Sequence, residues 1–298
     1  MGKVRVVTDS SAHFLDPGVI DRYQIAVLPL EIHFGSQRFK EGIDIDADEF
    51  FHRVSHGGPQ PVVVDPPPTE IAEIYARLGR ESDQIISIHR SRQLGPTLQN
   101  ATTAARTLLG RYDIALIDSL TTSAGLGIIV EEAARAAYQG ESLDSVVRIV
   151  RGIVPRIYSV FYVETLDYLQ HNRLLGEAQA ILGTMLGIKP FLTIEDGELV
   201  PMEKVRTRPQ AIDRLVEFVT EFSSVERMII LQNTPYPTEQ TRMLQERLMF
   251  EYPDREFPCM MYGPSLAAQI GPDGMGVVVY EGDAGLGDVD DLGDLDEF

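Results

Sequence analysis

The chain has 298 residues, with 26 basic and 45 acidic side chains, which gives a formal net charge of −19 at pH 7. This balance excludes general binding to nucleic acids or to anionic membranes, because both need a basic face. The length and the 44 % of hydrophobic residues suit one large or two modest globular domains, and the single cysteine excludes an intrachain disulfide or a multi-cysteine metal site.

The first half of the chain alternates short apolar runs with amphipathic ones. The apolar runs predict buried strands at Val4–Thr8, Ile25–Ile32, Ile85–His89 and Ala115–Asp118. Helical spacing predicts helices at Glu70–Leu78, Pro96–Leu109, Thr121–Gln139 and Leu143–Val154, with Thr69 and Ser142 as caps of the first and the last. Strands that alternate with helices predict a parallel sheet covered on both faces.

After Pro155 the pattern changes to strands mixed with fewer helices. Strands are predicted at Ile157–Val163, Ile188–Ile194, Glu198–Val205, Met228–Gln232, Pro258–Tyr262 and Met275–Tyr280. Helices are predicted at Glu177–Leu186, Pro209–Phe222 and Thr238–Phe250. Asp196-Gly197 separates two of the strands and is a strong hairpin signal.

These patterns predict an α/β protein with two domains and a tail. We expect an N-terminal domain with a parallel α/β sheet over residues 1–155 and a C-terminal α+β domain with a mixed or antiparallel sheet over residues 156–283. Residues 284–298 hold six acidic and no basic side chains, which is typical of a solvated acidic tail.

The chain shows no targeting or membrane signal. Its first residues run directly into a predicted strand, and no apolar run approaches the roughly 18 residues that a membrane span needs. Together with the single cysteine, this favours a cytoplasmic protein.

Several motifs that carry chemistry are incomplete. Gly125-Leu126-Gly127 lacks the third glycine of a dinucleotide fingerprint. Asp44–Glu49 begins like a calcium loop but has Glu49 where such a loop needs glycine, so we expect a charged turn that leads into a helix. His52 and His56 share a helix spacing but lack a third ligand, which favours a solvated pair. We therefore expect no metal.

Three polar segments follow predicted strands, at the sheet edge where α/β proteins bind ligands. They are Thr8-Asp9-Ser10-Ser11, His89-Arg90-Ser91-Arg92 and Asp118-Ser119. The second segment precedes a predicted helix, whose N-terminus would attract an anion. Simpler interpretations are a capping turn for the first segment and a surface loop with solvated arginines for the second.

The order of these segments resembles that of the DegV family of lipid-binding proteins, up to about Asp283. The matching segments are Thr8–Ser11, Val27–Leu30, Ser91–Ala101, Asp118-Ser119 with Gly125 and Gly127, Glu164–Leu169 with Arg173, Gly187–Pro190 and Asp196-Gly197. The resemblance implies two α/β domains that enclose a long-chain fatty acid, or a similar anionic amphiphile, without a further cofactor. It also implies a non-enzymatic role: presenting the carboxylate to a separate fatty-acid kinase in phospholipid metabolism.

The segments that would hold the head group depart from the family's pattern. Val63-Val64 stands where the family has Thr-Ser, Arg92 replaces the second serine of a pair, Gly95-Pro96 stands for Ser-Gly, and Gln269 stands for a histidine. The resemblance places the ligand site at Thr8, Asp9, Ser10, Ser11, Val63, Val64, Ser91, Arg92, Thr97, Arg173, Gln269 and Gly271.

Within this site, we predict that Arg92, with Ser91 and Thr97, holds an anionic head group through a charge-assisted bond. Gln269 could donate from its amide where the family uses histidine. The resemblance places Arg173 near the exposed end of the ligand.

Two other functions stay open at this point. One is a phosphotransferase or hydrolase that uses Asp9 with the neighbouring serines, although Ser11 stands where a phosphatase-type site would have its second carboxylate. The other is a sensor or adaptor for a different apolar ligand.

Overall fold

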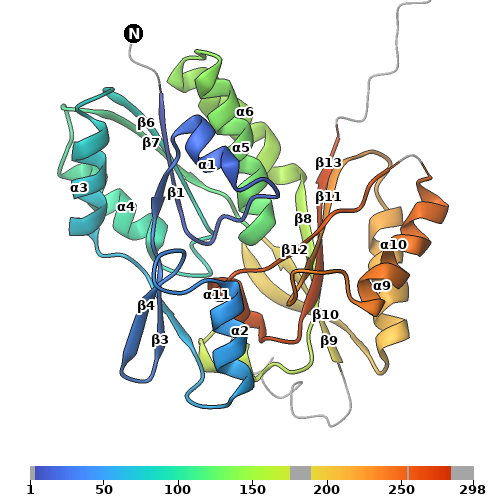
Figure 1. The fold of residues 1–298 in the computed structure, drawn as a ribbon. Coiled ribbons are helices and arrows are strands. Elements are labelled where there is room, and N and C mark those ends of the chain that lie inside the picture. The colour runs from blue at the N-terminus through green and yellow to red at the C-terminus, as the bar shows by residue number, and fades with distance from the viewer. Residues whose placement is uncertain (1–3, 175–188, 254, 283–298) are drawn as a thin grey trace, which may run out of the picture.

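The computed structural model describes residues 4–174, 189–253 and 255–282 of the chain (Figure 1). The helix expected at Glu177–Leu186 and the acidic tail at residues 284–298 lie outside the described residues. Within the described ranges, no helix is both long enough and apolar enough to span a membrane.

The first sheet is parallel and has the strand order β2-β1-β6-β7. Its members are β1 (Arg5–Asp9), β2 (Ala26–Leu28), β6 (Gln84–His89) and β7 (Asp113–Asp118). This confirms the predicted parallel sheet. The chain moves from β1 to β2 on one side and then returns to β6 on the other, so the strand order reverses between β1 and β6. The edge beyond the ends of these two strands is a topological switch point, where α/β sheets bind ligands.

Helices cover both faces of this sheet. On one face, α3 (Pro68–Leu78) and α4 (Thr97–Arg106) pack over the apolar side chains of β1 and β6. On the other face lie α5 (Ser123–Tyr138) and α6 (Leu143–Ile153), with α1 (Gly18–Tyr23) beside α5 (Figure 1). Ser142 caps α6 as predicted, but Thr69 does not cap α3. The α3 helix begins one residue earlier, at a proline that needs no partner for a backbone N–H.

The second sheet is mixed and has six strands in the order β10-β9-β8-β13-β11-β12. After a short 3₁₀ turn, η1 (Val154–Arg156), its strands are β8 (Ile157–Tyr162), β9 (Lys189–Glu195), β10 (Glu198–Val205), β11 (Val225–Gln232), β12 (Cys259–Met261) and β13 (Met275–Glu281). Among the strands of this sheet in the described residues, only β11 and β12 pair in parallel. Asp196 and Gly197 both have positive φ, which confirms the predicted hairpin turn.

Helix α5 lies between the two sheets and contacts β1 on one side and β13 on the other. The far face of the second sheet is covered by α9 (Arg208–Thr220) and α10 (Glu239–Glu251) (Figure 1). One buried cluster extends across the middle and takes apolar side chains from both sheets. The predicted domain boundaries therefore stay a prediction.

A small antiparallel sheet, β4-β3-β5, completes the fold. Its strands are β3 (Glu31–Phe34), β4 (Gln37–Lys40) and β5 (Val62–Val64), and around it lie α2 (Ala47–Ser55), α7 (Asp167–His171) and α11 (Pro264–Ile270). The prediction of one strand over Ile25–Ile32 is wrong, because the chain leaves the first sheet after Leu28 and enters the small sheet at Glu31. Pro29, which has no N–H for a ladder, stands at the break.

The charged turn predicted before α2 is confirmed. Asp46 caps this helix by accepting a hydrogen bond from the backbone N–H of Glu49 at 2.9 Å. His52 and His56 are exposed, with ring centroids 4.3 Å apart, as expected for a solvated pair.

Candidate functional site

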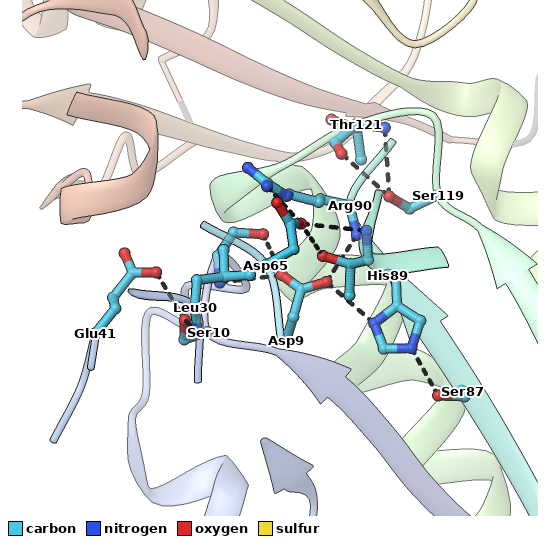
Figure 2. A network of polar contacts seen from close by, with 12 residues as sticks. Asp9, Ser10, Leu30, Glu41, Asp65, Ser87, His89, Arg90, Ser119 and Thr121 are labelled. Carbon is cyan, nitrogen blue, oxygen red and sulfur yellow. Dashed lines mark hydrogen bonds and ion pairs between the residues drawn. The ribbon is translucent and has the colours of Figure 1, made fainter. Parts of the chain in front are cut away.

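Asp9 ends β1 at the switch point and is fully buried (Figure 2). One of its carboxylate oxygens accepts hydrogen bonds from the backbone N–H of Arg90 at 3.0 Å and from Nδ1 of His89 at 3.1 Å. The other accepts from the backbone and hydroxyl of Ser11. Burial alone would raise the pKa of Asp9, but the hydrogen bond from His89, the charges of His89 and Arg90 and the hydrogen bond from Ser11 outweigh it and hold that pKa below its usual value.

A chain of hydrogen bonds continues from Asp9 into the layer under α3. His89 Nε2 lies 2.7 Å from the hydroxyl of Ser87, which accepts a hydrogen bond from the hydroxyl of Tyr75 at 2.8 Å. With Nδ1 of His89 facing Asp9 and Nε2 facing Ser87, both ring nitrogens have a hydrogen-bond partner, and so does the hydroxyl of Tyr75.

The order Ser87–His89–Asp9 matches that of a nucleophile, base and acid, but all three side chains are fully buried. The arrangement therefore holds β1 to β6, and Ser87 is closed to solvent. Among the described residues, no group of three or more His, Cys, Asp or Glu side chains could hold a metal ion.

Ser10, next to Asp9, connects β1 to a second buried carboxyl. Its hydroxyl donates to Glu41 at 2.7 Å and accepts from the backbone N–H of Leu30 at 2.9 Å (Figure 2). The other oxygen of Glu41 accepts from the backbone N–H of Ser265 in α11 at 2.8 Å. Burial raises the pKa of Glu41. This carboxyl thus joins α11 to the first half of the chain.

Arg90 and Asp65 form an ion pair at the start of α4. Arg90 is 1 % exposed, and its Nη2 donates to Oδ1 of Asp65 at 2.7 Å. The same oxygen accepts from the backbone N–H of Thr97 at 3.1 Å and from the Thr97 hydroxyl. Asp65 therefore acts as the cap of α4, because the residue before that helix is Pro96, whose side chain makes no capping bond.

A pocket of about 340 Å³ opens beside this ion pair, and we call it the head-group pocket. Its lining includes Val63, Asp65, Arg92, Leu94 and Gln269. Gln269 is buried and donates from Nε2 to the carbonyl of Leu94 at 3.1 Å. The pocket is thus apolar along Val63 and Leu94 and polar at Asp65 and Gln269.

A second pocket of about 560 Å³ lies between α2, residues 57–61 and α7. Tyr168 of α7 lines it, whereas Asn172, just after α7, lines the head-group pocket. Asn172 donates to the carbonyls of Pro61 at 3.3 Å and Ala268 at 2.8 Å. The end of α7 therefore separates the two pockets.

The structure brings together three of the predicted site residues, Val63, Arg92 and Gln269, in the lining of the head-group pocket. Thr97 lies directly behind it, with its hydroxyl on Asp65. Ser91 is fully buried under the turn between β9 and β10, where a Cβ on Gly197 would lie 2.1 Å from the Ser91 hydroxyl.

The other predicted site residues lie around this pocket rather than in its lining. Thr8 to Ser11 are buried at the switch point, and Val64 is exposed on β5. Arg173 follows Asn172, is exposed, and has a positive φ of 57°. Gly271 ends α11 with a φ of 91°, and a Cβ there would lie 3.0 Å from the ring of Tyr168.

The role predicted for Arg92 stays a prediction. Its side chain is 65 % exposed, and its Nε donates to Asp118 at 2.7 Å. Arg92 therefore stands at the rim of the pocket, already beside a carboxylate.

The sequence does not single out Asp65 or Glu41 as members of the site, and it shows His89 only as part of the polar segment after β6. Asp65 carries the clearest signal of the three, because it is a lone carboxylate within the apolar run from Pro61 to Pro68. Its partners Arg90 and Thr97 are 25 and 32 residues away along the chain, so the pairing appears only in the folded structure.

The chain is similar in sequence to known proteins over nearly its whole length. The family model described as "Uncharacterised protein, DegV family" matches residues 3–282. A DegV domain-containing protein of Caldanaerobacter subterraneus is 32 % identical over 283 residues, which cover 94 % of this chain and 100 % of that protein. Protein DegV of Bacillus subtilis is 29 % identical over 279 residues, which cover 92 % of this chain and 98 % of that protein.

Two solved structures of relatives share the fold over nearly their whole length. A DegV family protein from Thermus thermophilus, described by its fatty acid binding, superposes with a TM-score of 0.83 and 25 % identity, covering 94 % of this chain and 99 % of that one. DegV from Bacillus subtilis, described as a fatty acid binding protein, superposes with a TM-score of 0.82 and 27 % identity, covering 94 % and 100 %.

Proposed function

The chain belongs to the DegV family, and on this premise we propose that it is a non-enzymatic carrier that binds one long-chain fatty acid. The observation that carries the proposal is the head-group pocket, which combines buried polar groups with an apolar wall at the switch point of the first sheet. Relatives of the same fold described as fatty acid binding support it.

The acyl chain would extend from the pocket into the apolar cluster between the sheets. Leu94 belongs both to the pocket lining and to that cluster, so it marks the point where the two meet. Each buried methylene contributes about 0.8 kcal/mol, so a chain of roughly 14 contributes about 11 kcal/mol before the loss of motional freedom offsets much of it. The apolar chain thus supplies the affinity, and the polar end of the pocket supplies orientation.

The proposal extends to a partner: a separate fatty-acid kinase in the cytosol to which the carrier presents the head group. Arg173 supports this extension, because it is exposed and lies next to Asn172 of the pocket lining. A guanidinium at that position could contact a phosphate as it is transferred. Loss of acyl-phosphate formation in Arg173→Ala, with unchanged fatty-acid affinity, would support this role.

Mass spectrometry tests the carrier role directly. The purified protein is denatured, and the released small molecules are identified and counted. We expect one fatty acid per chain, and native mass spectrometry should show the same stoichiometry. A protein that releases no fatty acid and takes up none when fatty acids are added would contradict the proposal.

A matched pair of variants locates the ligand. Val63→Trp would fill the head-group pocket and should abolish uptake, whereas Val64→Trp, on the next and exposed residue of β5, should retain it. Thermal unfolding of both variants shows whether the loss comes from the filled pocket or from a damaged fold. Equal uptake by the two variants would place the ligand elsewhere.

A further inference from the structure

Asp65 puts a carboxylate in the head-group pocket, at the place best suited to an anion. Its side chain is 5 % exposed and lines the pocket. Three donors converge on its Oδ1: the backbone N–H of Thr97 at the start of α4, the Thr97 hydroxyl, and Nη2 of Arg90. The free amides and dipole of a helix N-terminus favour a negative charge there. The chain's own carboxylate therefore takes the contacts that a ligand carboxylate would use.

The charges around this pocket cancel in pairs. Inside, Arg90 neutralises Asp65, and at the rim Arg92 pairs with Asp118 at 2.7 Å. Arg92 and Arg173 are both exposed, so water screens whatever attraction they exert on a buried anion. The part of the chain that the structure describes offers no free buried cation beside the pocket. A ligand carboxylate next to Asp65 would thus be an unpaired buried charge, and such a charge strongly disfavours binding.

The second oxygen of Asp65 is available to a ligand. Among the described residues, every hydrogen bond to Asp65 goes to Oδ1, and none goes to Oδ2. A hydroxyl or a protonated carboxyl can donate to this oxygen, whereas an ionised carboxylate has no proton to donate and is repelled by it.

We infer that the head-group pocket takes an uncharged hydrogen-bond donor, and that Asp65 sets this selectivity. A fatty acid accordingly binds as its protonated acid and takes up one proton from solvent, while a long-chain alcohol binds without a proton. The inference rests on the proposed carrier function and names the form of the ligand that the carrier accepts.

The first test compares two ligands of equal chain length on the wild-type protein stripped of its ligand. Dodecanoic acid and dodecan-1-ol are titrated at pH 6, 7 and 8 by displacement of a fluorescent fatty probe. The acid should bind about tenfold more weakly for each unit rise in pH, because one proton is bound with it. The affinity of the alcohol should stay constant within about twofold, which is the scatter that proton-independent contacts allow.

The second test uses Asp65→Asn. This variant keeps an oxygen for the start of α4 but frees the buried cation of Arg90, so dodecanoate should bind at least about tenfold more tightly at pH 8 and lose its dependence on pH. Asp46→Asn is the matched control, because Asp46 also caps a helix, α2, but does not line the pocket. It should keep the wild-type pH dependence.

The outcomes separate the inference from the function on which it rests. Tight acid binding that does not change with pH, or an unchanged pH dependence in Asp65→Asn, would overturn the inference and leave the carrier function standing. Failure of both ligands to bind at every pH would overturn both. If Asp65→Asn does not fold, the wild-type comparison of acid and alcohol decides alone.

Discussion

Gly95 leaves the space that the guanidinium of Arg90 occupies. A Cβ on Gly95 would lie 2.1 Å from Nη2 of Arg90 and 2.9 Å from Oδ1 of Asp65. Arg90 is almost completely buried, so its guanidinium has no route into solvent. The glycine is therefore required by the close approach of an ion pair, and any side chain at position 95 would displace the group that caps α4.

Gly95→Ala should destabilise the protein by about 1–3 kcal/mol, as overpacking of a buried site does. Urea unfolding gives the free energy. Gly152→Ala is the control, since Gly152 lies in α6 and an added Cβ would meet no described atom within 4 Å apart from its chain neighbours and the backbone of its own helix. That variant should gain about 0.5–1 kcal/mol from helix propensity. Similar effects of the two substitutions would contradict the steric role of Gly95.

His89→Ala should destabilise the protein by about 3 kcal/mol at pH 7, because the buried carboxylate of Asp9 then loses one of the four hydrogen bonds that stabilise its charge. The folded pKa of Asp9 lies below its ordinary value of 3.8, so its stabilising effect is complete above that value and is lost as pH falls through the folded pKa. The difference between wild type and variant should therefore shrink from pH 7 to pH 3.

Tyr75→Phe is the control for that measurement. It removes only the hydrogen bond from Tyr75 to Ser87 and leaves Ser87 bonded to His89. The free energy of unfolding should therefore fall by about 1 kcal/mol. A loss of stability in Tyr75→Phe as large as in His89→Ala would contradict the proposal that His89 stabilises the fold mainly through the charge on Asp9.

Glu41→Gln should become more stable relative to wild type as pH rises from 5 to 8. Burial raises the folded pKa of Glu41, so the stability it adds is full below its ordinary value of 4.5 and is lost as pH rises through the folded pKa. Thermal unfolding at several pH values measures the difference. Glu198→Gln, an exposed substitution on β10, should show no such trend.

Arg92→Ala should weaken fatty-acid binding by less than about fivefold, because an exposed cation already paired with Asp118 contributes little. Titration of both proteins with dodecanoic acid measures the change. A loss of tenfold or more would instead support the prediction from sequence that Arg92 holds the head group.

Arg173→Gly should be more stable than Arg173→Ala by about 1 kcal/mol. Arg173 has a φ of 57°, a left-handed conformation that glycine adopts without strain and alanine does not. Thermal unfolding compares the two variants, which both lack the guanidinium. Equal stability of the two variants would contradict backbone strain at residue 173.

Local patterns were enough to predict most of the fold. Buried strands read as short apolar runs and surface helices as amphipathic ones, so β1, β6, β7 and the β9–β10 hairpin were predicted close to their observed bounds. A side chain can cap a helix only if it stands directly before the first helical residue. Ser142 stands there before α6, whereas α3 begins at Pro68 and so places Thr69 inside the helix. The prediction of a single strand over Ile25–Ile32 is wrong because an apolar run does not show which sheet each of its residues joins.

By itself the sequence determined the parallel sheet, the polar ends of its strands and the resemblance that placed Val63, Arg92 and Gln269 in one site. It did not determine that Arg90 is buried and Arg92 exposed, two residues apart. Strand alternation stops at His89, so no local rule assigns these side chains to the inside or the outside. Only the tertiary structure decides which of the two arginines is buried. It brings Asp65 and the space left by Gly95 to Arg90, and it brings Asp118 to Arg92.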